Sequence, residues 1–238
     1  MTALDAEHLQ KWIGKQAETE DTIDLKQTKL IEATFDRPSE LTSKDPLPPL
    51  WHWCFFLQGA PHSQLGRDGH PEKGDFLPPV PLPRRMWAGG RVSFHNPINI
   101  DNRVKKISTI LDVTPKEGRS GALCFVIVRH ELIAMNGQKL VTEEQDIVYR
   151  EDAEKGAAPA KPTAPPDDAI DQRIISPTTP WLFRYSALTF NGHRIHYDLD
   201  YAREVEGYAG LVVHGPLLAQ HLMLFATELM GPLTQFLF

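Results

Sequence analysis

The sequence lacks an excess of positive charge. Its 25 Lys and Arg residues are outnumbered by 31 Asp and Glu residues, which gives a formal net charge of -6 at pH 7. A polyanion such as DNA or RNA is attracted by a basic surface, and this composition does not provide one. We therefore expect no nucleic-acid partner.

Cysteine and long apolar runs are also scarce. The two cysteines, Cys54 and Cys124, lie in apolar stretches, which is typical of small buried hydrophobic residues in a reducing compartment rather than of a disulfide. No apolar run approaches the roughly 20 residues that a membrane-spanning helix needs. Residues 1–7 carry acids where a leader sequence would carry basic residues. These features predict a cytoplasmic protein without a membrane partner.

Several motifs of catalysis and cofactor binding are missing as well. The sequence has no Gly-x-Ser-x-Gly motif and no glycine-rich phosphate loop, which argues against a serine hydrolase and a nucleotide-dependent enzyme. Its C-terminal part contains His193, His196, His214 and His221, but no cysteine or Glu-x-x-His set completes three converging metal ligands. We expect neither a metal nor another cofactor.

The residues that are present predict a globular protein in two units. Hydrophobic residues make up 41% of the 238 residues, enough to build a core. Residues 154–180 are rich in Pro and Ala and contain few large apolar side chains, so that burial cannot repay their ordering and a linker is predicted. This linker separates an N-terminal unit, 1–153, from a C-terminal unit, 181–238.

The N-terminal unit has the pattern of an α+β fold. Apolar residues at helical spacing predict a short amphipathic helix over 6–16, and the apolar run 50–57 predicts a buried helix within an otherwise irregular, proline-interrupted tract. From Gly90 onward the pattern changes to strands. The segments 122–135 and 138–149 predict a β-hairpin, because Asn136-Gly137 supplies the positive φ angles of a tight turn. We expect a curled antiparallel sheet against one long helix.

The C-terminal unit centres on a second helix. Pro216 is tolerated in a first helical turn, and the apolar run after it predicts a central helix over 217–229. After this helix only 233–238 remain, too few residues for the sheet on which such a helix packs. We therefore expect this unit to be incomplete, with an apolar helix face left exposed.

Candidate catalytic groups gather in 189–198, where two histidines, an amide and a carboxylate are close in sequence. His196 is the first candidate, because an imidazole can take a proton from water near neutral pH. His193, two positions away, is either catalytic or a surface histidine on the opposite side of an extended segment. His214 either acts in the site or bonds to the backbone at a helix start, where free N–H groups can stabilise an oxyanion. Gly215 would let a ligand oxygen approach the backbone closely.

Both halves of the chain resemble a known family. They are similar to the hydroxyacyl-thioester dehydratase type 2 and mesaconyl-C4-CoA (itaconyl-CoA) hydratase group of the MaoC-like double-hotdog proteins, and the segments that carry the resemblance are 48–53, 76–90, 116–121, 183–198 and 206–216. The resemblance implies two hotdog units, each a sheet wrapped around a long helix, with the N-terminal unit non-catalytic and the C-terminal one active. It implies a hydro-lyase with an acyl-CoA thioester as substrate, and leaves a homodimer open.

The resemblance also assigns site residues. Related (R)-specific hydratases carry an Asp-x4-His signature that activates water while a backbone N–H binds the thioester oxygen. Aligned with it, His196 occupies the histidine position, Asn191 the aspartate position and His193 the place of a nearby asparagine. An amide cannot accept a proton as a carboxylate does, so either Asn191 orients the water and a histidine is the base, or a carboxylate such as Asp198 acts instead. The residues assigned to substrate binding are Tyr185, His214 and Gly215.

The implied reaction is reversible hydration of a short branched or dicarboxylic enoyl-CoA, such as mesaconyl-C4-CoA or itaconyl-CoA. Two alternatives stay open: a 3-hydroxyacyl-thioester dehydratase of longer chains, and a non-catalytic thioester-binding subunit, which Asn191 would favour. The Arg84-Arg85 pair is interpreted as a solvated turn or as a contact to the phosphates of CoA.

Overall fold

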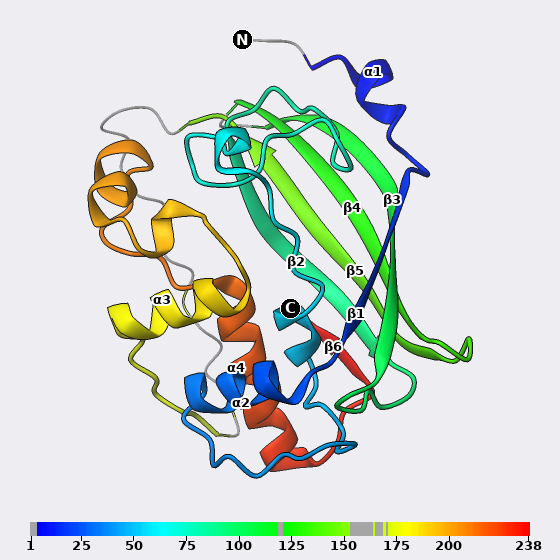
Figure 1. The fold of residues 1–238 in the computed structure, drawn as a ribbon. Helices are drawn as coiled ribbons and strands as arrows, with labels where there is room; N and C mark the ends of the chain where they lie inside the picture. The colour runs from blue at the N-terminus through cyan, green and yellow to red at the C-terminus, as the bar shows by residue number, and fades with distance from the viewer. Residues whose placement is uncertain (1–3, 119–120, 153–163, 165–168, 170) are drawn as a thin grey trace.

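An antiparallel sheet dominates the computed structural model, which describes residues 4–118, 121–152, 164, 169 and 171–238 (Figure 1). Its six strands run in the order β1-β3-β4-β5-β2-β6. The strands are β1 (Gln16–Thr22), β2 (Arg84–Phe94), β3 (Arg103–Gly118), β4 (Gly121–Ala134), β5 (Lys139–Arg150) and β6 (Gln235–Leu237).

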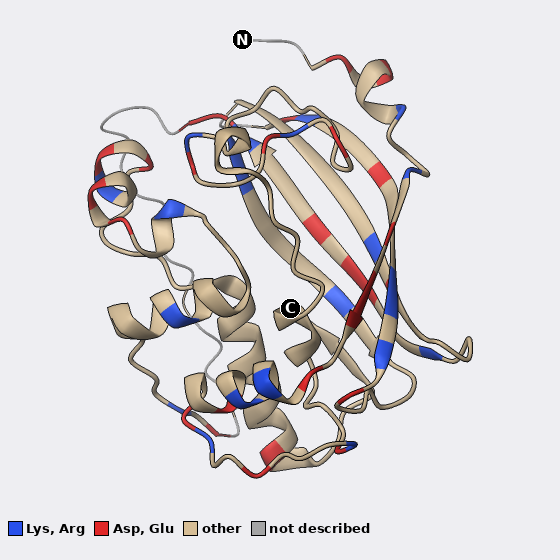
Figure 2. Ribbon diagram, in the orientation of Figure 1, with Lys and Arg blue, Asp and Glu red and all other residues tan. Residues whose placement is uncertain are grey.

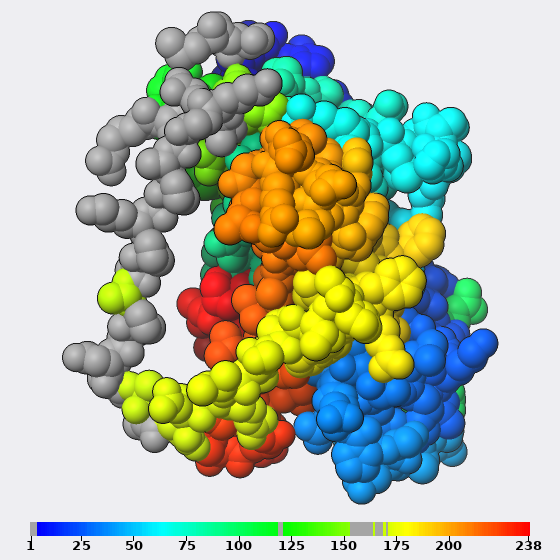
Figure 3. Space-filling model, turned by 90° about the vertical axis from the view of Figure 1, so that its left-hand side faces the viewer, coloured from blue at the N-terminus to red at the C-terminus, as the bar shows by residue number. Residues whose placement is uncertain are grey.

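Four α-helices and several short turns accompany the sheet. The helices are α1 (Ala6–Gln10), α2 (Leu25–Thr34), α3 (Thr179–Leu188) and α4 (Gly215–Met230); the single turns are η1 (Trp51–Cys54), η2 (His62–Gln64), η3 (Arg194–His196) and the π-helical η4 (Tyr201–Val205). Figure 3 shows α3 between α2 and the segment that contains η3 and η4. Together the strands and helices confirm the predicted α+β class. No helix of the described residues has the length and apolar character to cross a membrane.

The predicted hairpin is present, with a different turn. Strands β4 and β5 pair in an antiparallel register, and the Gly137 N–H donates to the Ala134 carbonyl. Only Gly137 in this turn has a positive φ, +87°, and the register shifts between Leu132 and Ile133. The loop is therefore longer than the tight turn that Asn136-Gly137 predicts. Along both strands, alternate residues face the core.

The predicted helix over 50–57 is wrong, because this segment forms only the single 3-10 turn η1. Leu50 before the turn has φ +67° and Phe56 after it has φ +57°, left-handed values that no α-helix accommodates. Most apolar side chains of the run are buried without helical packing, whereas Leu57 is exposed. Two elements in the tract predicted as irregular, β1 and α2, were missed, and the first helix, α1, ends at Gln10 rather than at residue 16.

The predicted C-terminal helix is confirmed as α4, with Pro216 in its first turn. Leu217 and Met223 are fully buried, whereas Leu222 is 58% and Met230 67% exposed. The helix thus has the exposed apolar face that the sequence predicts. After α4 the chain returns to the sheet, where β6 pairs with β2.

Residues from both predicted units share one core. The main hydrophobic cluster combines Ile100 and Val104 of the sheet side with Leu182 of α3 and Leu217 of α4. Most of the predicted linker lies outside the described residues, and the division at 154–180 stays a prediction. Acidic and basic side chains are interspersed on the strands (Figure 2), where Arg91 pairs with Asp146.

Candidate active site

The predicted catalytic segment lies against the start of α4. After α3 the chain turns through Phe190, whose φ is +49°, and forms the 3-10 turn η3. The Val212 N–H donates to the Ile195 carbonyl at 3.0 Å, which ties the two segments together just before the helix begins. Residues 193–196 and 212–215 thus lie side by side although they are apart in sequence.

His196 is buried and held in one tautomer. Its Nδ1 lies 2.7 Å from the Val212 carbonyl oxygen, which can only accept, so that Nδ1 carries the proton and the Nε2 lone pair is free. Burial lowers the pKa of His196 to about 4. The ring is therefore neutral near pH 7, which is the protonation state of a general base.

His214 packs against His196. Its ring stacks on that of His196, with the centroids 3.6 Å apart and the planes at 19°. His214 Nε2 and the Ser186 hydroxyl form a hydrogen bond of 2.8 Å, while Nδ1 is buried without a partner among the described residues. Burial lowers the pKa of His214 to about 3, so this ring too is neutral. The side chain bonds to a serine rather than to the backbone, and its predicted part in substrate binding stays a prediction.

His193 is not the surface histidine that one interpretation predicts. It is buried, and its Nε2 donates to Glu206 Oε1 at 3.2 Å. Glu206 also accepts the Tyr201 hydroxyl at 3.1 Å and pairs with Arg84 at 3.2 Å. His193 and Arg84 help to hold the pKa of the Glu206 carboxyl below its ordinary value. Glu206 is thus a buried carboxylate beside the site to which sequence reasoning gave no role.

Arg84 departs from both interpretations of the Arg84-Arg85 pair. Its side chain is 7% exposed, and besides Glu206 it donates to the Tyr208 hydroxyl at 2.7 Å. A buried, paired guanidinium is neither a solvated turn nor a free contact for CoA phosphates. Sequence reasoning could not find this ion pair, because Arg84 and Glu206 are 122 positions apart and only the fold brings them together.

Asn191 is the residue that the family resemblance aligns with the aspartate of related hydratases. Its Oδ1 accepts the His193 backbone N–H at 3.0 Å, so that its amide NH2 group is the part left for a ligand. Asp198, the alternative carboxylate, pairs with Arg194 at 2.7 Å and accepts the Tyr201 N–H. Among the described residues it is not part of either cavity wall below, whereas Asn191 belongs to both.

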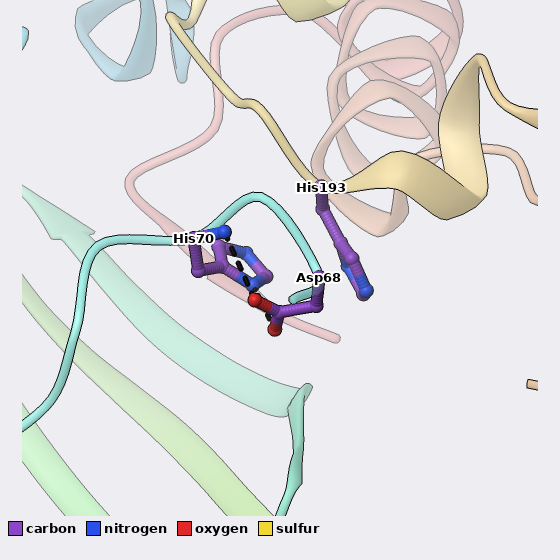
Figure 4. A group of neighbouring side chains, drawn as sticks. All are labelled: Asp68, His70 and His193. Carbon is purple, nitrogen blue, oxygen red and sulfur yellow. Dashed lines mark hydrogen bonds and ion pairs between the residues drawn. The ribbon is translucent and has the colours of Figure 1, made fainter. Parts of the chain in front are cut away.

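The loop after η2 brings a hydrogen-bonded aspartate and histidine next to His193. Figure 4 shows Asp68 and His70 facing His193, with His70 Nδ1 donating to Asp68 Oδ2 at 2.8 Å. The rings of His70 and His193 are 4.4 Å apart, and burial lowers the pKa of His70 to about 4. Asp68, His70 and His193 hold ligand atoms within 4.8 Å of one another, a spacing that suits a metal. Both histidines bond to carboxylates, His70 to Asp68 and His193 to Glu206. The expectation of no metal stays a prediction.

Two glycines allow segments of the chain to approach one another closely. A Cβ on Gly69, whose φ is +87°, would lie 2.0 Å from the Gly192 carbonyl oxygen. At Gly215 a Cβ would lie 2.6 Å from the Trp87 ring. The missing side chain of Gly215 therefore makes room for Trp87, a reason that differs from the predicted approach of a ligand oxygen.

Two adjoining cavities surround these groups. The first, about 420 Å³, is lined by residues that include His70, Asn191, His193, His196, Gly215 and Trp87. The second, about 330 Å³, lies between η1 and the sheet and includes Tyr185, whose buried hydroxyl has no partner among the described residues. The two share the wall residues Trp87, Gln145, Asn191 and Pro216.

The first cavity brings a neutral imidazole close to the start of a helix. His196 supplies a neutral imidazole, and Gly215 is the first residue of α4, where backbone N–H groups lack partners within the helix. Such N–H groups, together with the helix dipole, stabilise negative charge on an oxygen. The catalytic roles predicted for His196, Asn191 and His193 stay predictions, as do the substrate-binding roles of His214, Gly215 and Tyr185.

Known proteins with similar sequences point to one family. The family model described as hydroxyacyl-thioester dehydratase type 2 matches residues 50–238. A mesaconyl-C(4)-CoA hydratase of Chloroflexus aurantiacus is 50% identical over 214 residues, which cover 89% of this chain and 76% of that protein. The mitochondrial hydroxyacyl-thioester dehydratase type 2 of Schizosaccharomyces pombe is 29% identical over 201 residues, 74% of this chain and 66% of that protein.

Solved structures show the fold. A MaoC-like dehydratase from Phytophthora capsici superimposes with a TM-score of 0.65 at 15% identity, covering 98% of this chain and 81% of that one. HtdX of Mycobacterium tuberculosis gives a TM-score of 0.58 at 14% identity, with 88% and 75% covered. These likenesses confirm the predicted hotdog class of the α+β fold. With the sequence matches, they show that the chain belongs to the hydroxyacyl-thioester dehydratase type 2 family.

Proposed function

We propose that this chain is a hydro-lyase that adds water reversibly to the double bond of an enoyl-CoA thioester. The observation that carries the proposal is His196, a neutral imidazole at the cavity wall whose Nδ1 is occupied and whose Nε2 is free. The likeness to mesaconyl-C(4)-CoA hydratase supports a short dicarboxylic acyl group. It favours this substrate class over the longer chains of the alternative.

The reaction follows from these groups. His196 Nε2 takes a proton from water while the water oxygen bonds to the β-carbon of the enoyl group. The electron pair of the double bond moves toward the thioester oxygen, and the Gly215 N–H at the start of α4 holds the resulting enolate. The protonated His196 then returns a proton to the α-carbon, and dehydration reverses these steps. Asn191 orients the water through its amide NH2 group.

A panel of enoyl-CoA thioesters tests the proposal, with loss of the enoyl absorbance as the readout. We expect turnover of mesaconyl-C4-CoA with a higher kcat/KM than that of octenoyl-CoA. His196→Ala should lower kcat by roughly 10²- to 10⁴-fold with a much smaller change in KM, because it removes a positioned base but few binding contacts. Thioester binding without turnover of any substrate would instead favour a non-catalytic subunit.

We also propose a cytoplasmic location and a homodimer. The expectations of a cytoplasmic location and a homodimer rest on the sequence and on the family resemblance. Cell fractionation and light scattering of the purified protein measure them directly.

A further inference from the structure

The core-facing side of the sheet carries an unusual polar cluster. Along β3, β4 and β5 the residues on this side are mostly apolar, such as Val104, Leu132 and Val141. Five polar residues interrupt them in neighbouring registers: Lys106, Ser108, His130, Glu143 and Gln145. Because polar side chains are costly in a core unless they have partners, such a cluster calls for an account of each partner.

Four of the five members have hydrogen-bond partners. Glu143 Oε2 accepts hydrogen bonds from His52 Nε2 at 3.2 Å and Trp53 Nε1 at 2.8 Å. The Ser108 hydroxyl and His130 Nδ1 are 2.8 Å apart, and His130 Nε2 lies 3.4 Å from Gln145 Oε1. Glu143, the carboxylate of the cluster, thus bonds to His52 and Trp53.

Lys106 is the exception. Within the described parts of the chain, its Nζ has neither a carboxylate oxygen within 4.0 Å nor a hydrogen bond, and it lies 5.0 Å from the centre of the Phe56 ring. Burial lowers the pKa of its ammonium group, while the charges of Glu143 and Asp21 act in the opposite direction. An ammonium group that faces an aromatic ring at a cavity wall, with no carboxylate oxygen within 4.0 Å among the described residues, can bind a negatively charged group of a ligand.

The position of Lys106 connects it to the active site. It lines the second cavity, together with η1 residues and Tyr185. That cavity shares Asn191, Trp87 and two more wall residues with the cavity of His196. Part of the wall of the second cavity is the short turn η1 and the two residues after it, Phe55 and Phe56. Because Asn191 lines both cavities, an acyl group bound beside Asn191 has access to the second cavity.

We propose that Lys106 binds the free carboxylate of a short dicarboxylic acyl-CoA and so selects this substrate over uncharged enoyl-CoAs. The inference rests on the proposed hydratase function and names the residue that decides its substrate class. Lys106 is a binding residue in this account and moves no proton.

The test compares two substrates of one shape. In 3-methylcrotonyl-CoA a methyl group stands where mesaconyl-C4-CoA has its carboxylate. Lys106→Met keeps an unbranched side chain that is one atom shorter and removes the charge. We expect it to lower kcat/KM for mesaconyl-C4-CoA on the order of 10²-fold, the usual effect of truncating one partner of a buried charge pair. The activity toward 3-methylcrotonyl-CoA should stay the same or rise.

A matched control and a rescue variant complete the design. Lys105 is the preceding residue on the opposite side of β3, where it pairs with Glu18, and Lys105→Met should change neither activity. Lys106→Arg keeps the positive charge and should recover most of the preference. If Lys106→Met does not fold, the ratio of the two activities in Lys106→Gln and Lys106→Arg decides the question.

The outcomes separate the inference from the proposed function. If the unaltered protein hydrates mesaconyl-C4-CoA and the uncharged Lys106 variants keep its preference, the assignment of Lys106 is wrong. If the unaltered protein hydrates neither substrate, the proposed function is wrong. An equal loss of both activities in folded Lys106→Met would make Lys106 structural and would also overturn the assignment.

Discussion

Asn191 illustrates how one side chain limits the chemistry of this site. The family resemblance places it where related hydratases have aspartate, and its Oδ1 is occupied by the His193 backbone N–H. Only its amide NH2 group remains, and an NH2 group donates hydrogen bonds but accepts no proton. The proton of the water molecule must therefore go elsewhere, and His196 is the neutral base on the same cavity wall.

Asn191→Asp tests this division of labour. A carboxylate can accept the same His193 N–H, so we expect the variant to fold with an unchanged Tm and to retain or raise kcat. Its kcat should be compared with that of the parent at saturating mesaconyl-C4-CoA. Loss of folding, seen as a lost cooperative thermal transition, would show that the amide is needed for structure rather than for water.

At the scale of elements, one buried ion pair connects the sheet to the catalytic segment. Arg84 begins β2, and Glu206 follows η4, so their contact at 3.2 Å fixes the segment that carries His193 against the sheet. Both side chains are largely buried, 7% and 5% exposed. Removing one partner of such a pair leaves the other charge uncompensated.

Glu206→Gln should therefore destabilise the protein strongly. We expect the free energy of unfolding to fall by about 3–5 kcal/mol, the usual cost of breaking a buried pair, and a urea titration measures it. Asp198→Asn is the matched control, because Asp198 pairs with Arg194 at the surface and its loss should change stability little. Equal effects of the two substitutions would contradict a special role for the buried pair.

At the scale of the whole molecule, three half-buried or buried histidines make stability depend on pH. Burial lowers the pKa of His70 and His196 to about 4 and that of His214 to about 3. In the unfolded chain each has an ordinary pKa near 6.5. Between these values the unfolded state binds more protons than the folded one, so stability falls as the pH falls.

We therefore expect Tm to be nearly constant above pH 7 and to fall from about pH 6.5 down to about pH 4. Differential scanning calorimetry across this range measures the change. His214→Asn should weaken the pH dependence, because asparagine does not titrate. A Tm that stays constant down to pH 4 would mean that these rings are exposed to solvent in the folded protein.

Local patterns determined part of this fold without any help from tertiary structure. Alternating side chains predicted β4 and β5, and the apolar run after Pro216 predicted α4, because the periodicity of each element is a property of neighbouring residues. The resemblance of 183–198 also assigned His196 as the base and aligned Asn191 with the aspartate of related hydratases, and both assignments stay predictions. The family model that matches residues 50–238 then confirmed the predicted family.

Tertiary contacts decided the rest. The apolar run 50–57 suits a helix locally, but most of its side chains are buried around a single turn between Leu50 and Phe56, which both have left-handed φ angles. β1 is a polar edge strand that only its pairing with β3 defines. Glu206 and Lys106 look like ordinary surface charges in the sequence. Their roles depend on which groups the fold places around them, because the free energy of a charge is set by its surroundings in space.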